Sequence, residues 1–143
     1  MRRSWVAVLL LVGACTGPVR SSEVYESKAG QTAATAASAV QTAALAVDAA
    51  KGDKAFGRYL TQLLVEAEED AGSAQGTLDG IQPPDQRADE LRSRLDELLT
   101  EATGTLADLR IAARRGRFAE LPELAKPLPG VAAKLDDFAK AHG

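Results

Sequence analysis

Apolar residues recur at alternating steps of four and three along four segments of the chain, which is the spacing of helices that pack nearly parallel to one another. The first segment, residues 23–51, has a stripe of small residues that lets a partner helix approach closely. That stripe is Ala29, Ala33, Ala36, Val40, Ala43, Val47 and Ala50. We predict one long helix here, ended by Gly52 in a left-handed conformation.

Two further stripes predict a helix from an Asp53 cap to about Asp79 and another from an Asp85 cap to near Gly116. Gly80, Pro83 and Pro84 separate the two helices. The second stripe is Phe56, Leu60, Leu63, Ala67, Ala71, Ala74 and Leu78. The third is Ala88, Leu91, Leu95, Leu98, Ala102, Thr105, Leu109 and Ala112, widened by Leu99, Leu106 and Ala113.

The last segment keeps the same spacing but is interrupted by three prolines, each of which removes a backbone donor and disfavours helix at the residue before it. We predict a short helix over 118–126, a kink across Pro127–Gly130, and a helix that continues to Ala141. The stripe is Leu121, Leu124, Leu128, Val131, Leu135 and Phe138, interrupted by Pro122, Pro127 and Pro129.

The sequence shows no strand-like alternation, and the connections between the four segments are short. These features predict an all-α fold, an up-down-up-down four-helix bundle whose fourth helix is kinked or broken at Pro127–Gly130. In this arrangement the N-terminus, the turn at 80–84 and the C-terminus share one end. Gly52 and the Gly116 turn share the other end.

The N-terminus has the layout of a signal peptide. Arg2 and Arg3 supply positive charge, residues 5–12 are apolar, and Gly13 and Ala14 are small. The apolar stretch is too short to span a bilayer permanently. It leads directly to Cys15, which is the only cysteine of the chain.

This leader resembles those of bacterial lipoproteins, whose lipobox is a branched apolar residue, two small residues and a cysteine, matched here by Val12, Gly13, Ala14 and Cys15. The resemblance implies lipid on the Cys15 sulfur, cleavage before Cys15, and anchoring at the extracytoplasmic face of the cell membrane. It divides the chain into a signal peptide (1–14), a lipidated cysteine and tether (15–22), and one helical domain (23–143). The alternative is an ordinary secretory leader with an incidental cysteine.

The charge balance of the chain limits the classes of partner that it can bind. It holds 17 basic and 20 acidic residues, and removal of the leader takes Arg2 and Arg3 away. A mildly acidic surface argues against general binding of nucleic acid, which needs a basic surface to displace counterions. The only histidine, His142, lies beside the C-terminus, where we expect fraying. We therefore predict no metal, no cofactor and no catalytic residue.

The strongest charge cluster lies at the end of the third predicted helix, and its members are Arg110, Arg114, Arg115 and Arg117. This patch could dock an acidic envelope protein or an anionic polymer. The alternative is that the arginines stabilise the helix dipole, since cations are favourable at a helix C-terminus.

For each of three other groups of residues, a structural interpretation competes with a functional one. The carboxylates Glu66, Glu68, Glu69 and Asp70 point around more than half a helical turn, so we expect a solvated face rather than a metal or acid–base site. The polar strip Gln31, Thr35, Ser38 and Thr42 is either a flat partner surface or a solvent face. The aromatic residues Tyr25, Phe56, Tyr59, Phe118 and Phe138 are expected to fill the core or the bundle ends.

Beyond the leader, the domain resembles the small helical lipoproteins of GC-rich Gram-positive bacteria in general character rather than in a specific motif. Our first hypothesis is a non-enzymatic lipoprotein that binds a partner or acts as a structural module in the cell envelope. Our second is a small-ligand-binding or sensory bundle in which the kinked fourth helix opens a cavity near Pro127–Gly130, lined by a few polar groups. The third hypothesis is that the protein is an enzyme.

Overall fold

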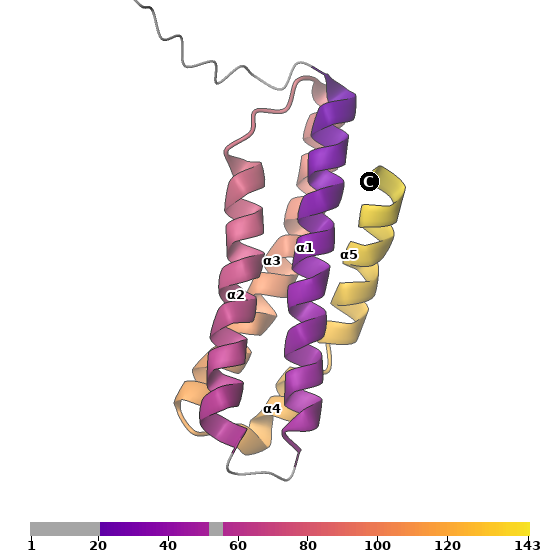
Figure 1. Ribbon diagram of the computed structural model, residues 1–143. Coiled ribbons are helices and arrows are strands. Elements are labelled where there is room, and N and C mark those ends of the chain that lie inside the picture. The colour runs from indigo at the N-terminus through magenta and orange to yellow at the C-terminus, as the bar shows by residue number, and fades with distance from the viewer. Residues whose placement is uncertain (1–20, 52–55) are drawn as a thin grey trace, which may run out of the picture.

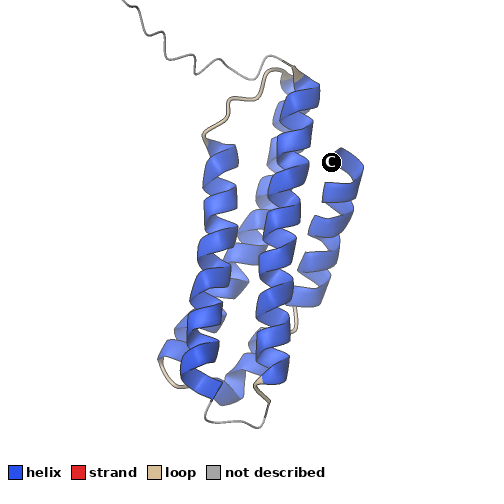
Figure 2. Ribbon diagram, in the orientation of Figure 1, coloured by secondary structure: helices blue, strands red, loops and turns tan. Residues whose placement is uncertain are grey.

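The computed structural model describes residues 21–51 and 56–143. Within these residues every regular element is a helix, so the predicted all-α class is confirmed (Figure 2). The elements are α1 (Ser22–Ala49), α2 (Gly57–Asp79), α3 (Gln86–Arg114), the 3-10 helix η2 (Phe118–Glu120), α4 (Leu121–Leu124) and α5 (Leu128–His142). The leader, the lipobox with Cys15, Gly52 and Asp53 lie outside the described residues.

The helices form an elongated bundle in which α1 packs against α5, α2 and α3 (Figure 1). The chain runs in one direction along α1 and α3 and in the opposite direction along α2 and α5. Asp85, at the end of the turn between α2 and α3, accepts a hydrogen bond from Ser22 at the start of α1, and we call this the Ser21 end of the bundle. The last turn of α1 lies beside the Gly116 turn, which defines the Gly116 end.

The predicted apolar stripes form the core. The stripe of α1 is buried throughout, apart from the half-buried Ala50 that follows the helix. Most of the α2 and α3 stripes is buried as well, and their half-buried members are Phe56, Leu63, Ala74, Leu98 and Thr105. Leu64 on α2 is fully buried although it lies outside the predicted stripe. Heptad spacing therefore identifies the inward faces of these helices, because burial must follow the helical period.

The break in the last segment is displaced from its predicted position. The short helix α4 ends at Leu124, residues 125–127 form a turn, and α5 begins at Leu128. Pro129 and Gly130 therefore lie inside α5. Proline fits the first turn of a helix because the backbone N–H that it lacks has no intrahelical partner there. The stripe nevertheless stays in phase, since Leu121, Leu128, Val131 and Leu135 are all buried.

Side-chain and backbone caps set the helix ends. The Ser21 hydroxyl accepts a hydrogen bond from the Val24 N–H, so α1 begins at Ser22, one residue before the predicted start. Asp85 caps α3 as predicted, accepting from the Ala88 N–H at 2.8 Å. At the other end of α3, Gly116 has a φ of 70°. Its N–H donates to Ala113 at 3.0 Å, and the N–H of Arg117 donates to Ala112 at 2.9 Å, which closes the helix.

Candidate ligand-binding groove

The four arginines of the predicted patch do not act as one group. Arg110 turns toward α2 and donates two hydrogen bonds to the carboxylate of Glu68, which raises the pKa of Arg110. Arg117 pairs with Glu120 at 2.7 Å. Arg114 and Arg115 are exposed and form no ion pair with any residue that the structure describes. As a partner patch this cluster stays a prediction, and its unpaired charge is confined to Arg114 and Arg115.

The acidic residues of α2 lie as expected for a solvated face. Glu66, Glu69 and Asp70 are exposed, whereas Glu68 is directed to Arg110. Across residues 21–51 and 56–143, histidine, cysteine and carboxylate side chains form no group of three or more that could hold a metal ion.

The polar strip of α1 lines one side of a depression between α1 and α2. Thr35, Ser38 and Thr42 face Glu66 and Asp70 across a space of about 450 Å³. The hydroxyls of Thr35 and Thr42 donate to the carbonyls four residues earlier in their own helix. These hydroxyls are therefore already partnered within α1, which favours the solvent-face interpretation.

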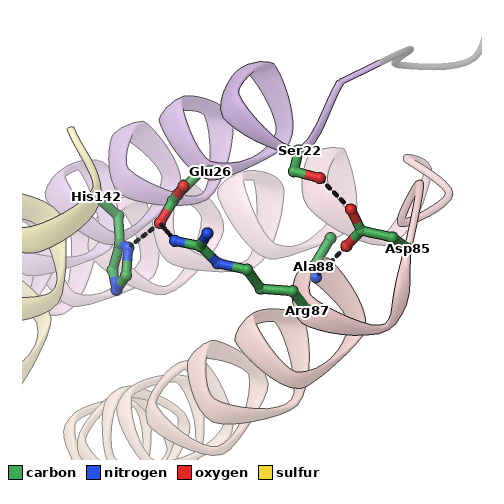
Figure 3. A network of polar contacts seen from close by, with 6 residues as sticks. All are labelled: Ser22, Glu26, Asp85, Arg87, Ala88 and His142. Carbon is green, nitrogen blue, oxygen red and sulfur yellow. Dashed lines mark hydrogen bonds and ion pairs between the residues drawn. The ribbon is translucent and has the colours of Figure 1, made fainter.

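A polar network joins three helices at the Ser21 end, and it corrects the expectation that His142 is frayed (Figure 3). The His142 Nδ1 lies 2.9 Å from a Glu26 oxygen, which Arg87 approaches from α3 at 3.4 Å. The imidazole also packs on Phe138, with ring centroids 4.6 Å apart. The reason is that α5 continues to His142 and lays its last turn on α1, so the ring is held between two helices.

Ser22 and Asp85 form the other part of this network. The Ser22 hydroxyl donates to Asp85 rather than to His142, and this bond, followed by the one from the Ala88 N–H, lowers the pKa of Asp85. In this network the serine and the histidine are thus not paired as a nucleophile and a base. The arrangement holds the ends of α1, α3 and α5 together.

A groove of about 700 Å³ lies at the opposite, Gly116 end of the bundle. Its walls come from the last turn of α1, the first turn of α2, and the segment from Gly116 to α4. The apolar wall residues are Val47, Ala50, Leu60, Phe118, Leu121 and Pro122. The volume falls within the range of roughly 300–1,000 Å³ that is usual for small-molecule sites.

Gly57 and Phe118 determine one side of the groove. A Cβ built on Gly57 would lie 2.9 Å from the tip of the Phe118 ring, so only glycine lets the ring lie on the first turn of α2. Phe118 keeps 40% of its surface exposed in this position. An aromatic face next to a hollow gives a ligand a rigid apolar surface to contact.

A second hollow of about 310 Å³ adjoins the groove and shares Val47, Lys51 and Pro122 with it. It lies between α1 and the α4–α5 turn, where Pro129 and the exposed Leu45 also line it. Leu45 is 71% exposed. The two hollows together extend across the Gly116 end, and the lining of the second also includes the charged residues Asp48, Lys51 and Lys126.

The groove differs from the predicted cavity in position and in its residues. The sequence placed a cavity near Pro127–Gly130, whereas the groove lies at Gly116–Pro122 and only the smaller hollow reaches Pro129. Gly57, Lys51 and Ala119 were not singled out beforehand. The one available signal was Gly57 itself, a glycine close to the start of a helix, where its conformational freedom is costly unless a close contact requires it.

Comparisons of the chain with protein-family models, with curated proteins and with solved structures find no match. Among the described residues, no helix has the length and apolar character that a membrane span requires.

Proposed function

We propose that this protein is a lipid-anchored protein of the extracytoplasmic face of the cell membrane that acts by binding a small apolar or amphipathic molecule in the groove at its Gly116 end. The observation that carries the proposal is the groove: its wall is mostly apolar, its volume suits a small molecule, and Phe118 stays partly exposed beside it. Sequestering such surface from water favours an apolar ligand by about 25 cal/mol for each Å² buried.

The anchoring part of the proposal is supported by the leader. Val12, Gly13, Ala14 and Cys15 match the lipobox pattern, and two or three acyl chains on Cys15 hold a protein stably at a bilayer because each buried methylene contributes about 0.8 kcal/mol. A lipidated sulfur is also protected from the oxidative cross-linking that an exported free cysteine faces.

We further propose that α4 and α5 together form the broken fourth helix of an up-down-up-down four-helix bundle. Two observations support it: the chain reverses direction from α1 to α2, α3 and α5, and the buried stripe continues in phase from Leu121 to Leu135 across the turn. This architecture puts the groove at the end of the bundle that is far from the tether.

Titration with Nile red, a neutral apolar dye, tests the binding function. The sample is the full chain carrying Cys15→Ser, which cannot be acylated. We expect saturable fluorescence enhancement, and we expect Ala119→Trp to weaken binding about tenfold, since Ala119 lines the groove and the indole fills it. The matched control is Ala133→Trp, at an exposed position of α5, which should leave the affinity unchanged. Equal affinities for the two tryptophan variants contradict the proposal.

A partner-binding or structural module is the second candidate, and the exposed Arg114 and Arg115 favour it. An anionic polymer or acidic envelope protein would pair with these two side chains at the end that faces away from the membrane. Cross-linking in intact envelopes compares the wild type with an Arg114→Glu/Arg115→Glu variant. Loss of a cross-linked species in the variant supports this candidate, and unchanged recovery contradicts it.

A further inference from the structure

From the position of Phe118 we infer that the groove selects a ligand with a flat aromatic ring, which packs against the Phe118 ring, and that Gly57 holds the Phe118 ring in place. This inference rests on the proposed binding function and specifies both the chemical class of the ligand and the residue that selects it. It combines three observations: the exposure of the ring, the fixed backbone that carries it, and its close contact with Gly57.

Phe118 is the one aromatic residue in the described lining of the groove. The other side chains of this lining are aliphatic, apart from Lys51, whose ammonium group pairs with Asp48 at 2.5 Å. Aliphatic side chains attract saturated and aromatic molecules alike, because the gain follows the apolar area that is buried. Contact between two aromatic rings adds to this gain. Phe118 is therefore the residue of the described lining that can distinguish an aromatic ligand from a saturated one.

The Phe118 ring is available to a ligand. Phe118 keeps 40% of its surface exposed. Phe56 and Tyr59, which lie next to Gly57 in the chain, pack edge to face on each other with their ring centroids 5.0 Å apart. Phe118 forms no such pair with another ring in the described part of the chain. A ring of the ligand can thus supply the aromatic partner that Phe118 lacks there.

The backbone around Phe118 is held on both sides. Before it, Gly116 and Arg117 donate their N–H groups to carbonyls at the end of α3. After it, the Glu120 N–H donates to the Arg117 carbonyl at 3.1 Å, and the chain enters α4 at the buried Leu121. A side chain on a fixed backbone has less freedom to lose when a ligand packs against it, which favours binding.

Gly57 supports the ring at its tip. A Cβ built on Gly57 would lie 2.9 Å from Cζ, 3.2 Å from Cε2 and 3.4 Å from Cε1 of Phe118. An added methyl group must therefore push the tip of the ring away from α2. The tip of a flexible side chain moves more easily than the backbone of a helix, so the helix should stay in place while the ring shifts. Gly57 is thus a positioning residue, which acts on the ligand through Phe118.

Competition against Nile red tests the preference on the full chain carrying Cys15→Ser, the parent chain. The competitors are 2-naphthol and decahydro-2-naphthol, which share one bicyclic skeleton and one hydroxyl group and differ in aromaticity. The saturated molecule has at least as much apolar surface, so burial alone does not favour 2-naphthol. We expect 2-naphthol to bind about fivefold more tightly, because its rings contact Phe118.

Two substitutions with matched controls assign this preference. Phe118→Leu keeps an apolar side chain but removes the ring, so the two affinities should then agree within about twofold. Its control is Tyr59→Leu, which removes an exposed aromatic side chain outside the described lining and should keep the preference. Gly57→Ala should reduce the preference by displacing the ring, whereas Gly72→Ala, with open space around it, should not. Unchanged far-UV circular dichroism establishes that each variant is folded.

Nuclear magnetic resonance locates the contact in the parent chain without a further substitution. The chain has three phenylalanines, so selective labelling of their rings gives few signals to assign. Bound 2-naphthol should shift the ring protons of Phe118 upfield, because protons above the face of an aromatic ring are shielded. Phe138, which packs on His142 at the Ser21 end, is the internal control and should not shift.

The outcomes separate the inference from the function on which it rests. Tighter binding of 2-naphthol that is lost in Phe118→Leu supports the inference. Equal or tighter binding of decahydro-2-naphthol by the parent chain, or no upfield shift at Phe118, overturns it and leaves the groove as a binding site, provided that Ala119→Trp still blocks the dye. A preference that is unchanged in Gly57→Ala overturns the positioning role of Gly57. Dye binding that Ala119→Trp does not affect overturns both the inference and the proposed function.

Discussion

Gly30 on α1 lies directly against the backbone of His142 at the end of α5. A Cβ built on Gly30 would stand 2.8 Å from the carbonyl carbon and oxygen of His142 and 2.8 Å from the Gly143 nitrogen. Real Cβ atoms do not approach other atoms so closely. The absent side chain at Gly30 therefore lets the last turn of α5 reach α1 and brings His142 to Glu26.

Gly30→Ala should lower the free energy of unfolding by about 1 kcal/mol, because the overpacking cost exceeds the gain that alanine brings to a helix. Gly104→Ala is the matched control. Gly104 lies inside α3 with open space around it, so alanine there should raise stability by roughly 0.5–1 kcal/mol. Urea denaturation measures both. Equal stabilisation by the two substitutions contradicts the close contact between Gly30 and His142.

Tyr25→Phe should stabilise the protein. The Tyr25 ring is fully buried, its hydroxyl has no hydrogen-bond partner among the described residues, and burial raises its pKa. Removing an unsatisfied hydroxyl should increase the free energy of unfolding by about 1 kcal/mol. Tyr59→Phe is the control, because Tyr59 is 58% exposed and its change should be near zero. A loss of stability in Tyr25→Phe shows instead that the hydroxyl is satisfied.

Arg110 and Glu68 should be coupled more strongly than the surface ion pairs. Their side chains are about one quarter exposed and share two hydrogen bonds between α3 and α2. A double-mutant cycle with Arg110→Gln and Glu68→Gln should give a coupling of about 0.5–1 kcal/mol. The same cycle on Lys126 and Glu123, whose side chains are 68% and 75% exposed, should give almost none. Similar couplings for the two pairs contradict this difference.

Asp85 should make the stability depend on pH in the acid range. Hydrogen bonds from Ser22 and from the Ala88 N–H lower the pKa of Asp85 in the folded protein, so the folded state favours the carboxylate. This contribution is complete above the pKa of an unfolded aspartate and is lost as the pH falls through the folded pKa.

Asp85→Asn isolates this effect, because asparagine also caps a helix but does not titrate in this range. Denaturation of the wild type and the variant at a series of pH values should give a stability difference that is constant near neutrality and shrinks in acid. A difference that stays constant at every pH rules out the contribution of the Asp85 carboxylate.

The sequence was sufficient to predict the helices and their buried faces, because apolar residues at heptad spacing all lie on one face of a helix and that face packs inward. Ala29, Val40, Leu95 and Leu135 were all placed correctly in the core. The break in the last segment was displaced because a proline such as Pro129 interrupts a helix only beyond its first turn.

The groove and the position of His142 could not be predicted in this way. The groove depends on Phe118 lying over Gly57, and the His142 network depends on Gly30, so both need contacts between residues that are far apart in the chain. Periodicity reports which face of a helix is buried, but it does not report how closely two helix ends approach. Gly57 near the start of α2 and Gly30 inside the alanine-rich α1 were the hints of these two approaches.

The anchoring proposal is tested most directly by the intact mass of the full chain purified from the membranes of a bacterium that expresses it. The account predicts a mature protein that begins at Cys15 and carries the added mass of a diacylglyceryl group, with or without a third acyl chain, and it predicts that Cys15→Ser carries none. A mature protein with an unmodified Cys15, or a protein that still carries residues 1–14, contradicts it.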